Sequence, residues 1–179
     1  MQHEINTIIN SILTDNITSH TYPKNLLSVS KQLLKGEFSD EIIHSFLEIG
    51  HFPQINAKFY QSKLQEKWLN TLFGLIKKSK FNTGILIQQR VNRYSKRILF
   101  QTINGKKINK ISYSEAWERI KTIASSILKL TQESDQSVIG LYAPNSLESA
   151  LVDLACLSFN IKIVPIPANT SKEHLKYII

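Results

Sequence analysis

The sequence predicts an α/β chain in which a helical N-terminal segment is followed by a β-hairpin and an incomplete parallel βαβ unit. Two observations lead to this prediction. The first eighty residues show helical periodicity almost throughout and contain no convincing strand. From residue 81 onward, short strand-like runs alternate with amphipathic helical runs. We therefore expect a helical extension over residues 1–80 and a separate α/β part over residues 81–179.

Four helices are expected in the N-terminal part, and local signals mark where they begin and end. Pro23 suits a first helical turn, Ser39 suits an N-cap, and Gly50 suits the end of a helix. The last helix should be the longest, running from Pro53 or the next residue to about Lys78. The expected ranges are residues 2–14, 23–35, 39–50 and 53–78.

The end of the fourth expected helix, residues 64–80, combines a broad apolar face with several lysines. This composition would suit a helix that lies on a membrane surface. It also suits a helix that packs on a core and exposes a lysine-rich exterior. Gly74 and Glu66 weaken the membrane interpretation, so the core-facing helix is favoured.

The second part begins with a short helix over residues 85–93 and a predicted hairpin. Strands are expected at residues 98–102 and 108–111, joined at Asn104-Gly105, a pair in which both residues tolerate positive φ. Ser112 and Glu115 then form an S-x-x-E capping box that begins an amphipathic helix.

Residues 137–167 predict the parallel βαβ unit. Buried strands are expected at residues 137–142 and 161–166, the latter closed by prolines. Asn145 and Glu148 suit an N-x-x-E capping box for the intervening helix, and Asn160 suits its left-handed C-terminal residue. Strands joined by a helix pair in parallel through a right-handed crossover. Downstream, Thr170 and Glu173 repeat the capping-box pattern.

The net charge of +8 is concentrated in the second part of the chain. Residues 81–179 hold thirteen Lys and Arg against seven acids, whereas residues 1–80 hold nine Lys against seven acids. Seven of these cations fall within one acid-free stretch: Arg90, Arg93, Lys96, Arg97, Lys106, Lys107 and Lys110. Such a cluster can bind phosphate or nucleic acid, but a solvated face is the more common role.

The sequence gives no sign of a disulfide, a targeting segment or a metal site. Cys156 is the only cysteine, so it forms no internal disulfide, and its place inside a helix favours a buried thiol. No apolar run is long enough for a membrane span, and the N-terminus does not read as a secretory signal. The five histidines show no metal-ligand spacing. We expect a cytoplasmic protein.

Two stretches resemble the AMP-forming acyl-CoA synthetases and their adenylate-forming relatives. The first reads KISYSEAWERIKTIASSIL and contains Ser112, Tyr113 and Glu115, which match the Ser/Thr-Tyr pair and following acid of that family's first core motif. The second runs from residue 137 to 179, where Asn145-Ser146 and the run Val164-Pro-Ile-Pro match the family's next strand–turn–helix–strand segment. Asn160-Ile161 departs from the usual Gly-Ala pair, at a structural position. The likeness covers about residues 85–179 and looks closest to the fatty acyl-CoA branch.

The resemblance implies a ligase in which a carboxylate attacks ATP to give an acyl-adenylate and pyrophosphate, after which a thiol takes the acyl group. The implied substrate is a fatty acid, and the implied cofactors of the complete enzyme are ATP, Mg²⁺ and coenzyme A. The family's phosphate-binding loop lies downstream of the matched region, and no G-x-x-x-x-G-K-[ST] or G-x-G-x-x-G occurs in the sequence.

We therefore expect a truncated adenylation domain over residues 81–179 that is inactive by itself. We expect no catalytic, cofactor-binding or metal-binding residue in the chain. Its expected partners are the remainder of the adenylation domain and a carboxylic acid substrate.

Two alternatives come from other classes of function. The chain could be a non-catalytic module whose basic segment binds nucleic acid, although only Tyr94 and Phe100 supply aromatic rings there. It could instead be a helical interaction or membrane-surface domain that works through residues 1–80, with weak membrane contact through residues 64–80.

Overall fold

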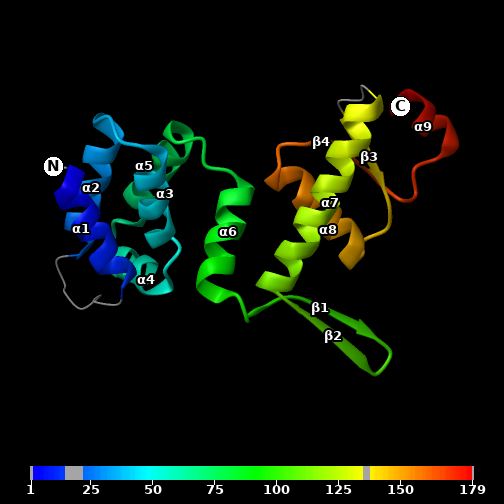
Figure 1. Cartoon of the computed structure of the whole chain (residues 1–179). Helices are drawn as coiled ribbons and strands as arrows, with labels where there is room; N and C mark the ends of the chain where they lie inside the picture. Colours follow the sequence, from blue (N-terminus) through cyan, green and yellow to red (C-terminus); the bar gives the residue numbers. More distant parts are fainter. Residues whose placement is uncertain (1, 15–21, 135–137, 179) are drawn as a thin grey trace. The chain divides into compact units, whose positions relative to one another are not determined.

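The computed structural model describes residues 2–14, 22–134 and 138–178 (Figure 1). The chain divides into two compact units, residues 1–81 and residues 82–179. Each unit has a hydrophobic core of its own. The predicted class is confirmed, since helices are followed by an antiparallel hairpin and then by a parallel pair of strands.

Every regular element among the described residues of unit 1 is a helix, as predicted. The expected long helix over residues 53–78 is wrong, because the chain breaks into two helices at residues 62–64. Lys63 takes φ +57° there, and the amide of Leu64 donates to the carbonyl of Phe59 at 3.0 Å. This is a Schellman ending without glycine. The helices are α1 (Gln2–Leu13), α2 (Tyr22–Lys35), α3 (Asp40–Ile49), α4 (Pro53–Gln61) and α5 (Gln65–Lys78).

The core of unit 1 is built around Trp68 of α5. Its side chain is fully buried, stacks on Phe59 at 4.3 Å between ring centroids, and meets the edge of Phe46 at 5.9 Å. Most of the apolar face of α5 therefore packs inward, which confirms the core-facing interpretation of residues 64–80. Leu69 and Phe73 are the exceptions, with 44% and 60% of their surface exposed.

The end of α5 is tied to the end of α2. Lys78 donates from Nζ to the carbonyls of Leu33 at 2.8 Å and Leu34 at 3.0 Å, and also to that of Gly36. These carbonyls belong to the C-terminal end of α2, where helix geometry leaves acceptors without intrahelical partners and where a cation is favoured.

Unit 2 contains every predicted element of the second part, with several shifted boundaries. Its elements are α6 (Thr83–Tyr94), β1 (Ile98–Asn104), β2 (Lys107–Ser112), α7 (Tyr113–Ser134), β3 (Val138–Tyr142), α8 (Leu147–Ser158), β4 (Lys162–Ile166) and α9 (Lys172–Ile178). The hairpin turn lies one residue later than predicted, at Gly105-Lys106. Asn104 instead pairs with Lys107, and Gly105 has the positive φ of +58°. The ladder of paired backbone groups therefore continues through Asn104.

The N-terminus of α7 carries the predicted capping box. The amide of Ser112 donates to Glu115 Oε2 at 2.8 Å, and the amide of Glu115 donates to Ser112 Oγ at 3.3 Å. Next to this cap, the amides of Tyr113 and Ser114 donate to the carbonyls of Arg97 and Ser95. The turn between α6 and β1 is thereby fixed to the start of α7.

The caps predicted for α8 and α9 are wrong by one residue. Ser146, not Asn145, is the N-cap of α8, and it exchanges hydrogen bonds with Ser149 rather than with Glu148. At α9, the amide of His174 donates to Ser171 Oγ at 3.3 Å, so Ser171 takes the place predicted for Thr170. Asn, Ser and Thr are all favoured N-cap residues, so the local preference does not separate adjacent positions.

The C-terminal end of α8 matches the prediction. Asn160 takes φ +56°, and the amide of Ile161 donates to the carbonyl of Cys156 at 2.9 Å. An asparagine thus occupies the left-handed position that glycine most often fills.

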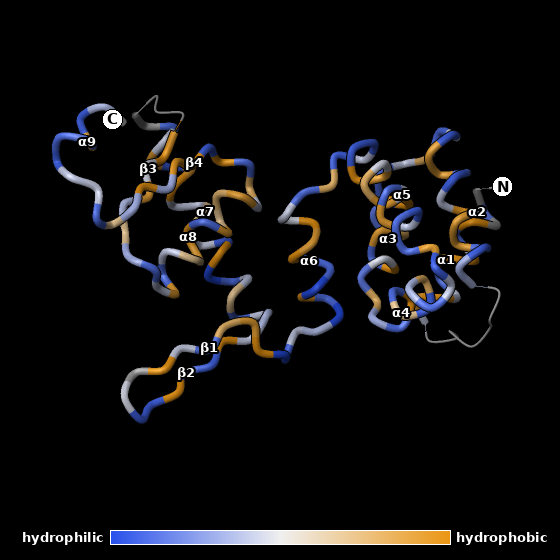
Figure 2. Tube along the Cα trace, turned by 180° about the vertical axis from the view of Figure 1, so that it is seen from behind, coloured by the Kyte–Doolittle hydropathy of each residue, from blue (hydrophilic) through white to orange (hydrophobic). Residues whose placement is uncertain are grey.

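The parallel pairing of β3 with β4 is confirmed, but the strands are not buried as predicted. Val138 pairs with Lys162 and Tyr142 pairs with Ile166, in register along both strands. Val138, Tyr142 and Val164 remain 47%, 50% and 41% exposed. Pro165 lies within β4 instead of closing it. Figure 2 shows apolar positions along both strands. Ser137, included in the predicted strand, lies outside the described residues.

The helices of the described residues are too short or too polar to cross a membrane.

Candidate functional site

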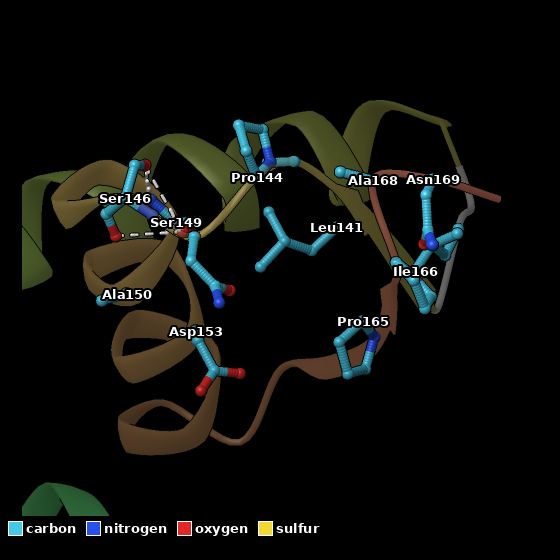
Figure 3. Close-up of a pocket in the computed structure, with 13 residues that line it drawn as sticks. Leu141, Pro144, Ser146, Ser149, Ala150, Asp153, Pro165, Ile166, Ala168 and Asn169 are labelled. Carbon is cyan, nitrogen blue, oxygen red and sulfur yellow. Dashed lines mark hydrogen bonds between the residues drawn. The ribbon is translucent and has the colours of Figure 1, made fainter.

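A hollow of about 810 Å³ lies where the carboxyl ends of β3 and β4 meet the start of α8 (Figure 3). Open α/β sheets bind ligands at the carboxyl edge of their strands, so this is the expected place for a site. The hollow is lined by Leu141, Ala143, Pro144, Asn145, Ser146, Ser149, Ala150, Asp153, Pro165, Ile166, Pro167, Ala168 and Asn169. We call it the strand-end crevice.

The polar groups of the strand-end crevice are few. Ser146 and Ser149 are already engaged with each other in the cap of α8. Asp153 projects from α8 into the hollow, facing Pro165 across it, and Asn169 lies on the loop after β4 (Figure 3). The lining has a single carboxylate and neither lysine nor arginine. It offers hydrogen bonds to a neutral polar group, but no cation to neutralise a triphosphate.

The loop that closes one side of the crevice is fixed by Tyr142. Its hydroxyl donates to the carbonyl of Ala168 at 3.0 Å and lies 3.4 Å from that of Thr170. Since Tyr142 is the last residue of β3, these bonds tie the segment after β4 back to the neighbouring strand.

Cys156 lies one helical turn from Asp153 and is fully buried. Burial raises the pKa of its thiol above the ordinary value, and the negative charge of Asp153 raises it further. Because the thiolate is the reactive form, this cysteine is unsuited to act as a nucleophile at neutral pH.

The residues that carry the family resemblance serve to begin helices. Ser112 and Glu115 close the start of α7, and Ser146 closes the start of α8. Hydrogen bonds from the amide and hydroxyl of Ser112 lower the pKa of the Glu115 carboxyl below its usual value. Ser112, Glu115 and Ser146 therefore fix where α7 and α8 begin.

The basic residues predicted as a possible anion site do not all lie together, but are spread over α6, the turn after it, the hairpin tip and β2. Arg90 and Arg93 lie in α6, and Lys96 and Arg97 lie in the turn after it. The lysines at 106–107 lie at the hairpin tip, while Lys110 lies within β2. Lys110 lines a second hollow of about 680 Å³ together with Arg119 and Glu148, so cations and an acid are mixed there.

The histidines and acids do not converge on a metal site. Across residues 2–14, 22–134 and 138–178, no group of three His, Cys, Asp or Glu side chains could hold a metal ion. His44 Nε2 lies 2.8 Å from the carbonyl of Ser79, and its ring meets the edge of Phe81. The strand-end crevice offers one carboxylate, that of Asp153, and no cationic side chain for the phosphates of ATP.

No lining residue of the strand-end crevice was predicted as a site residue, although Asp153 supplies its carboxylate and Asn169 a carboxamide. The signal for Asn169 is its place directly after a predicted parallel strand, because strand ends converge at one sheet edge. Asp153 is harder to find, since it lies two helical turns from that edge along α8.

Comparison with known proteins assigns most of the second unit to a family. A family model described as AMP-binding enzyme matches residues 87–179, which run from the middle of α6 through α9. No curated protein and no solved structure matches the chain.

Proposed function

The chain belongs to the AMP-binding enzyme family, and from that premise we propose that it forms the first part of the adenylation domain of an acid–thiol ligase. At the level of the family, the activity is ATP-dependent activation of a carboxylate. We propose further that the acid is a fatty acid and that coenzyme A accepts the acyl group. The observation that carries the proposal is the family match, which spans all but the first residues of unit 2.

In the proposed reaction, a carboxylate oxygen attacks the α-phosphorus of ATP, and the bond to the departing pyrophosphate breaks. The thiol then attacks the acyl carbon of the mixed anhydride and AMP leaves. Charge builds on phosphate oxygens in the first step and needs cations or backbone donors around it. Since the strand-end crevice has neither lysine nor arginine, we assign that role to other parts of the adenylation domain.

The described residues of unit 2 serve, in this proposal, as scaffold. Caps at Ser112 and Ser146 fix where α7 and α8 begin. The sheet of β3 and β4 leaves Val138 and Val164 exposed, and a parallel sheet is normally covered on both faces. These exposed residues support the remainder of the adenylation domain as the partner. Residues 1–80 form a helical extension in this proposal, and residues 81–179 the start of that domain.

Carboxylate-dependent exchange of labelled pyrophosphate into ATP tests the proposed activity. We expect no exchange with the 179-residue chain alone and clear exchange with a polypeptide that includes the remaining parts of the adenylation domain. Acids of increasing chain length identify the substrate, and coenzyme A compared with a carrier-protein thiol identifies the acceptor. Cys156→Ala in the longer polypeptide is a control that should keep the exchange rate, because the thiol is buried.

Two outcomes would contradict the proposal. Exchange by the 179-residue chain alone would place the chemistry within these residues. Failure of the longer polypeptide to exchange pyrophosphate with any carboxylate would remove the ligase assignment altogether.

A weak contact of residues 64–80 with a membrane surface is a second, minor proposal. It is supported by Leu69 and Phe73, which lie one turn apart on α5 and stay exposed beside Lys77. Vesicle flotation of the chain and of its Phe73→Ser variant tests it, and equal flotation of both would contradict it. We propose a cytoplasmic location for the protein, supported by its single, buried cysteine.

A further inference from the structure

Two arginines gather over one tyrosine ring at the end of α6. The guanidinium carbon of Arg97 lies 4.2 Å from the ring centroid of Tyr94, and that of Arg90 lies 5.8 Å from the same centroid. The two guanidinium carbons are thus within about 10 Å of each other. We call these three side chains the Arg–Tyr–Arg cluster.

The two positive charges of the cluster lack a compensating acid. Among the described residues, no ion pair joins a carboxylate to Arg90 or Arg97. The sequence contains no Asp or Glu between Glu66 and Glu115. The carboxylate of Glu115 is engaged elsewhere, since Oε2 accepts from the amide and from the hydroxyl of Ser112 at 2.8 Å each.

The cluster is held in place by both side-chain and backbone contacts. The carbonyl of Arg97 accepts from the amide of Tyr113 at 2.9 Å, and that of Ser95 accepts from Ser114 at 3.1 Å. The turn that carries Arg97 is therefore fixed to the start of α7. The ring of Tyr94 limits the freedom of both guanidinium groups, which lowers the entropy lost when they bind a ligand.

We propose that Arg90 and Arg97 bind a phosphate group of a small soluble ligand. A guanidinium presents paired N–H donors that match the oxygens of a phosphate, and two of them can share one dianion. Bound phosphate relieves the repulsion between two unpaired like charges. This site is separate from the strand-end crevice and does not depend on the proposed ligase activity.

The position of the other cations distinguishes a compact ligand from an extended polyanion. Lys106 and Lys107 are at the hairpin tip, beyond the seven residues of β1. A strand rises about 3.3 Å per residue, so the tip is roughly 20 Å from Arg97 along the strand. A single phosphate group on the Arg–Tyr–Arg cluster cannot touch these lysines, whereas a nucleic acid strand could contact both places.

Titration of the full chain with inorganic phosphate, followed by NMR of the arginine Nε–H groups, tests the proposal. We expect saturable shifts of the Arg90 and Arg97 signals and no such shifts with chloride at matched ionic strength. The double variant Arg90→Gln/Arg97→Gln should lose affinity at least tenfold. The matched control Lys106→Gln/Lys107→Gln removes the same charge at the hairpin tip and should change the affinity less than twofold.

A second pair of variants separates positioning from charge. Tyr94→Leu keeps the net charge but frees both guanidinium groups, so affinity should fall about threefold, while Tyr94→Phe keeps the ring and should retain it. Circular dichroism melting confirms that each variant is folded.

Equal losses in the two double variants would overturn the proposal, because they would reveal general attraction between charges. Binding only to vesicles that contain phosphatidic acid would overturn the soluble ligand and assign a lipid headgroup. Binding only to a single-stranded oligonucleotide would overturn it in favour of a polyanion.

Discussion

Ser112 and Glu115 show how a motif that resembles an enzyme family can have a structural role. Each side chain accepts a hydrogen bond from the other's backbone amide, which satisfies two amides at the start of α7. The hydroxyl of Ser112 also donates to the carboxylate, so the pair prefers the ionised form of Glu115. The resulting fall in the pKa of Glu115 links the cap to pH.

We predict that Ser112→Ala lowers the free energy of unfolding of unit 2 by about 1 kcal/mol at pH 7. A carboxyl whose folded pKa is depressed contributes stability above its unfolded pKa, near 4.5, and that contribution is lost as the pH falls through the folded value. The difference between wild type and variant should therefore shrink below pH 4.5. Urea unfolding of both proteins at pH 7 and at pH 3 measures this difference in unfolding free energy.

Ser125→Ala is the matched control for this cap, since Ser125 is exposed on the same helix. Its unfolding free energy should change by no more than about 0.5 kcal/mol, with alanine favoured by helix propensity. A Ser112→Ala penalty that stays constant between pH 7 and pH 3 would show that the ionised Glu115 has no part in the cap.

At the scale of elements, the close approach of α6 to α8 depends on Gly84. A Cβ at this position would lie 2.5 Å from the carbonyl oxygen of Ser158. The oxygen belongs to the backbone of α8, so it cannot turn aside as a flexible side chain would. The small residue thus sets how closely these two helices pack in unit 2.

We predict that Gly84→Ala destabilises unit 2 by about 1–3 kcal/mol, because the clash exceeds the roughly 1 kcal/mol that alanine gains by helix propensity. Gly140→Ala is the matched control. Its Cβ would lie 3.5 Å from Ile166 Cδ1, an ordinary contact, and should change stability by about 0.5 kcal/mol or less. Thermal melting followed by the ¹⁹F signal of Trp117, in the chain labelled with 5-fluorotryptophan, compares them, and a Gly84→Ala variant as stable as wild type would refute the close approach.

At the scale of the whole molecule, each unit has one tryptophan and one core. Trp68 lies in the core of unit 1, and Trp117 packs against the core of unit 2, with its ring stacked on Phe159. The two core clusters share no residue. The two tryptophans are therefore separate reporters of the two cores.

We predict that the two units unfold with different midpoints. When the chain is labelled with 5-fluorotryptophan, ¹⁹F NMR should resolve one signal for each tryptophan during urea unfolding. Leu33→Ala removes a fully buried side chain of unit 1 and should lower only the midpoint seen by Trp68, since it costs about 2–5 kcal/mol. Leu151→Ala should lower only the midpoint seen by Trp117. Equal shifts of both signals would mean that the two cores unfold as one cooperative body.

The sequence by itself determined the features that depend on neighbouring residues. The helix boundaries at Ser39 and Gly50 were located correctly, and the capping box at Ser112 and the left-handed Asn160 follow from local backbone chemistry. The parallel pairing of β3 and β4 was also predicted from the sequence, because two strands joined by a helix pair in parallel through a crossover connection. The strand-end crevice was not predicted, because it forms where the ends of two strands meet the start of a helix in space.

Tertiary structure alone decided the features in which distant groups meet. The predicted long helix breaks at Lys63, and Ser146 replaces the predicted cap Asn145, because the local preferences involved differ by about 1 kcal/mol or less. The burial of Trp68, the approach of Gly84 to Ser158, and the exposure of Val164 depend on packing between elements. Packing is set by contacts that no single stretch of sequence contains, and its free energy exceeds the local preferences that it overrides.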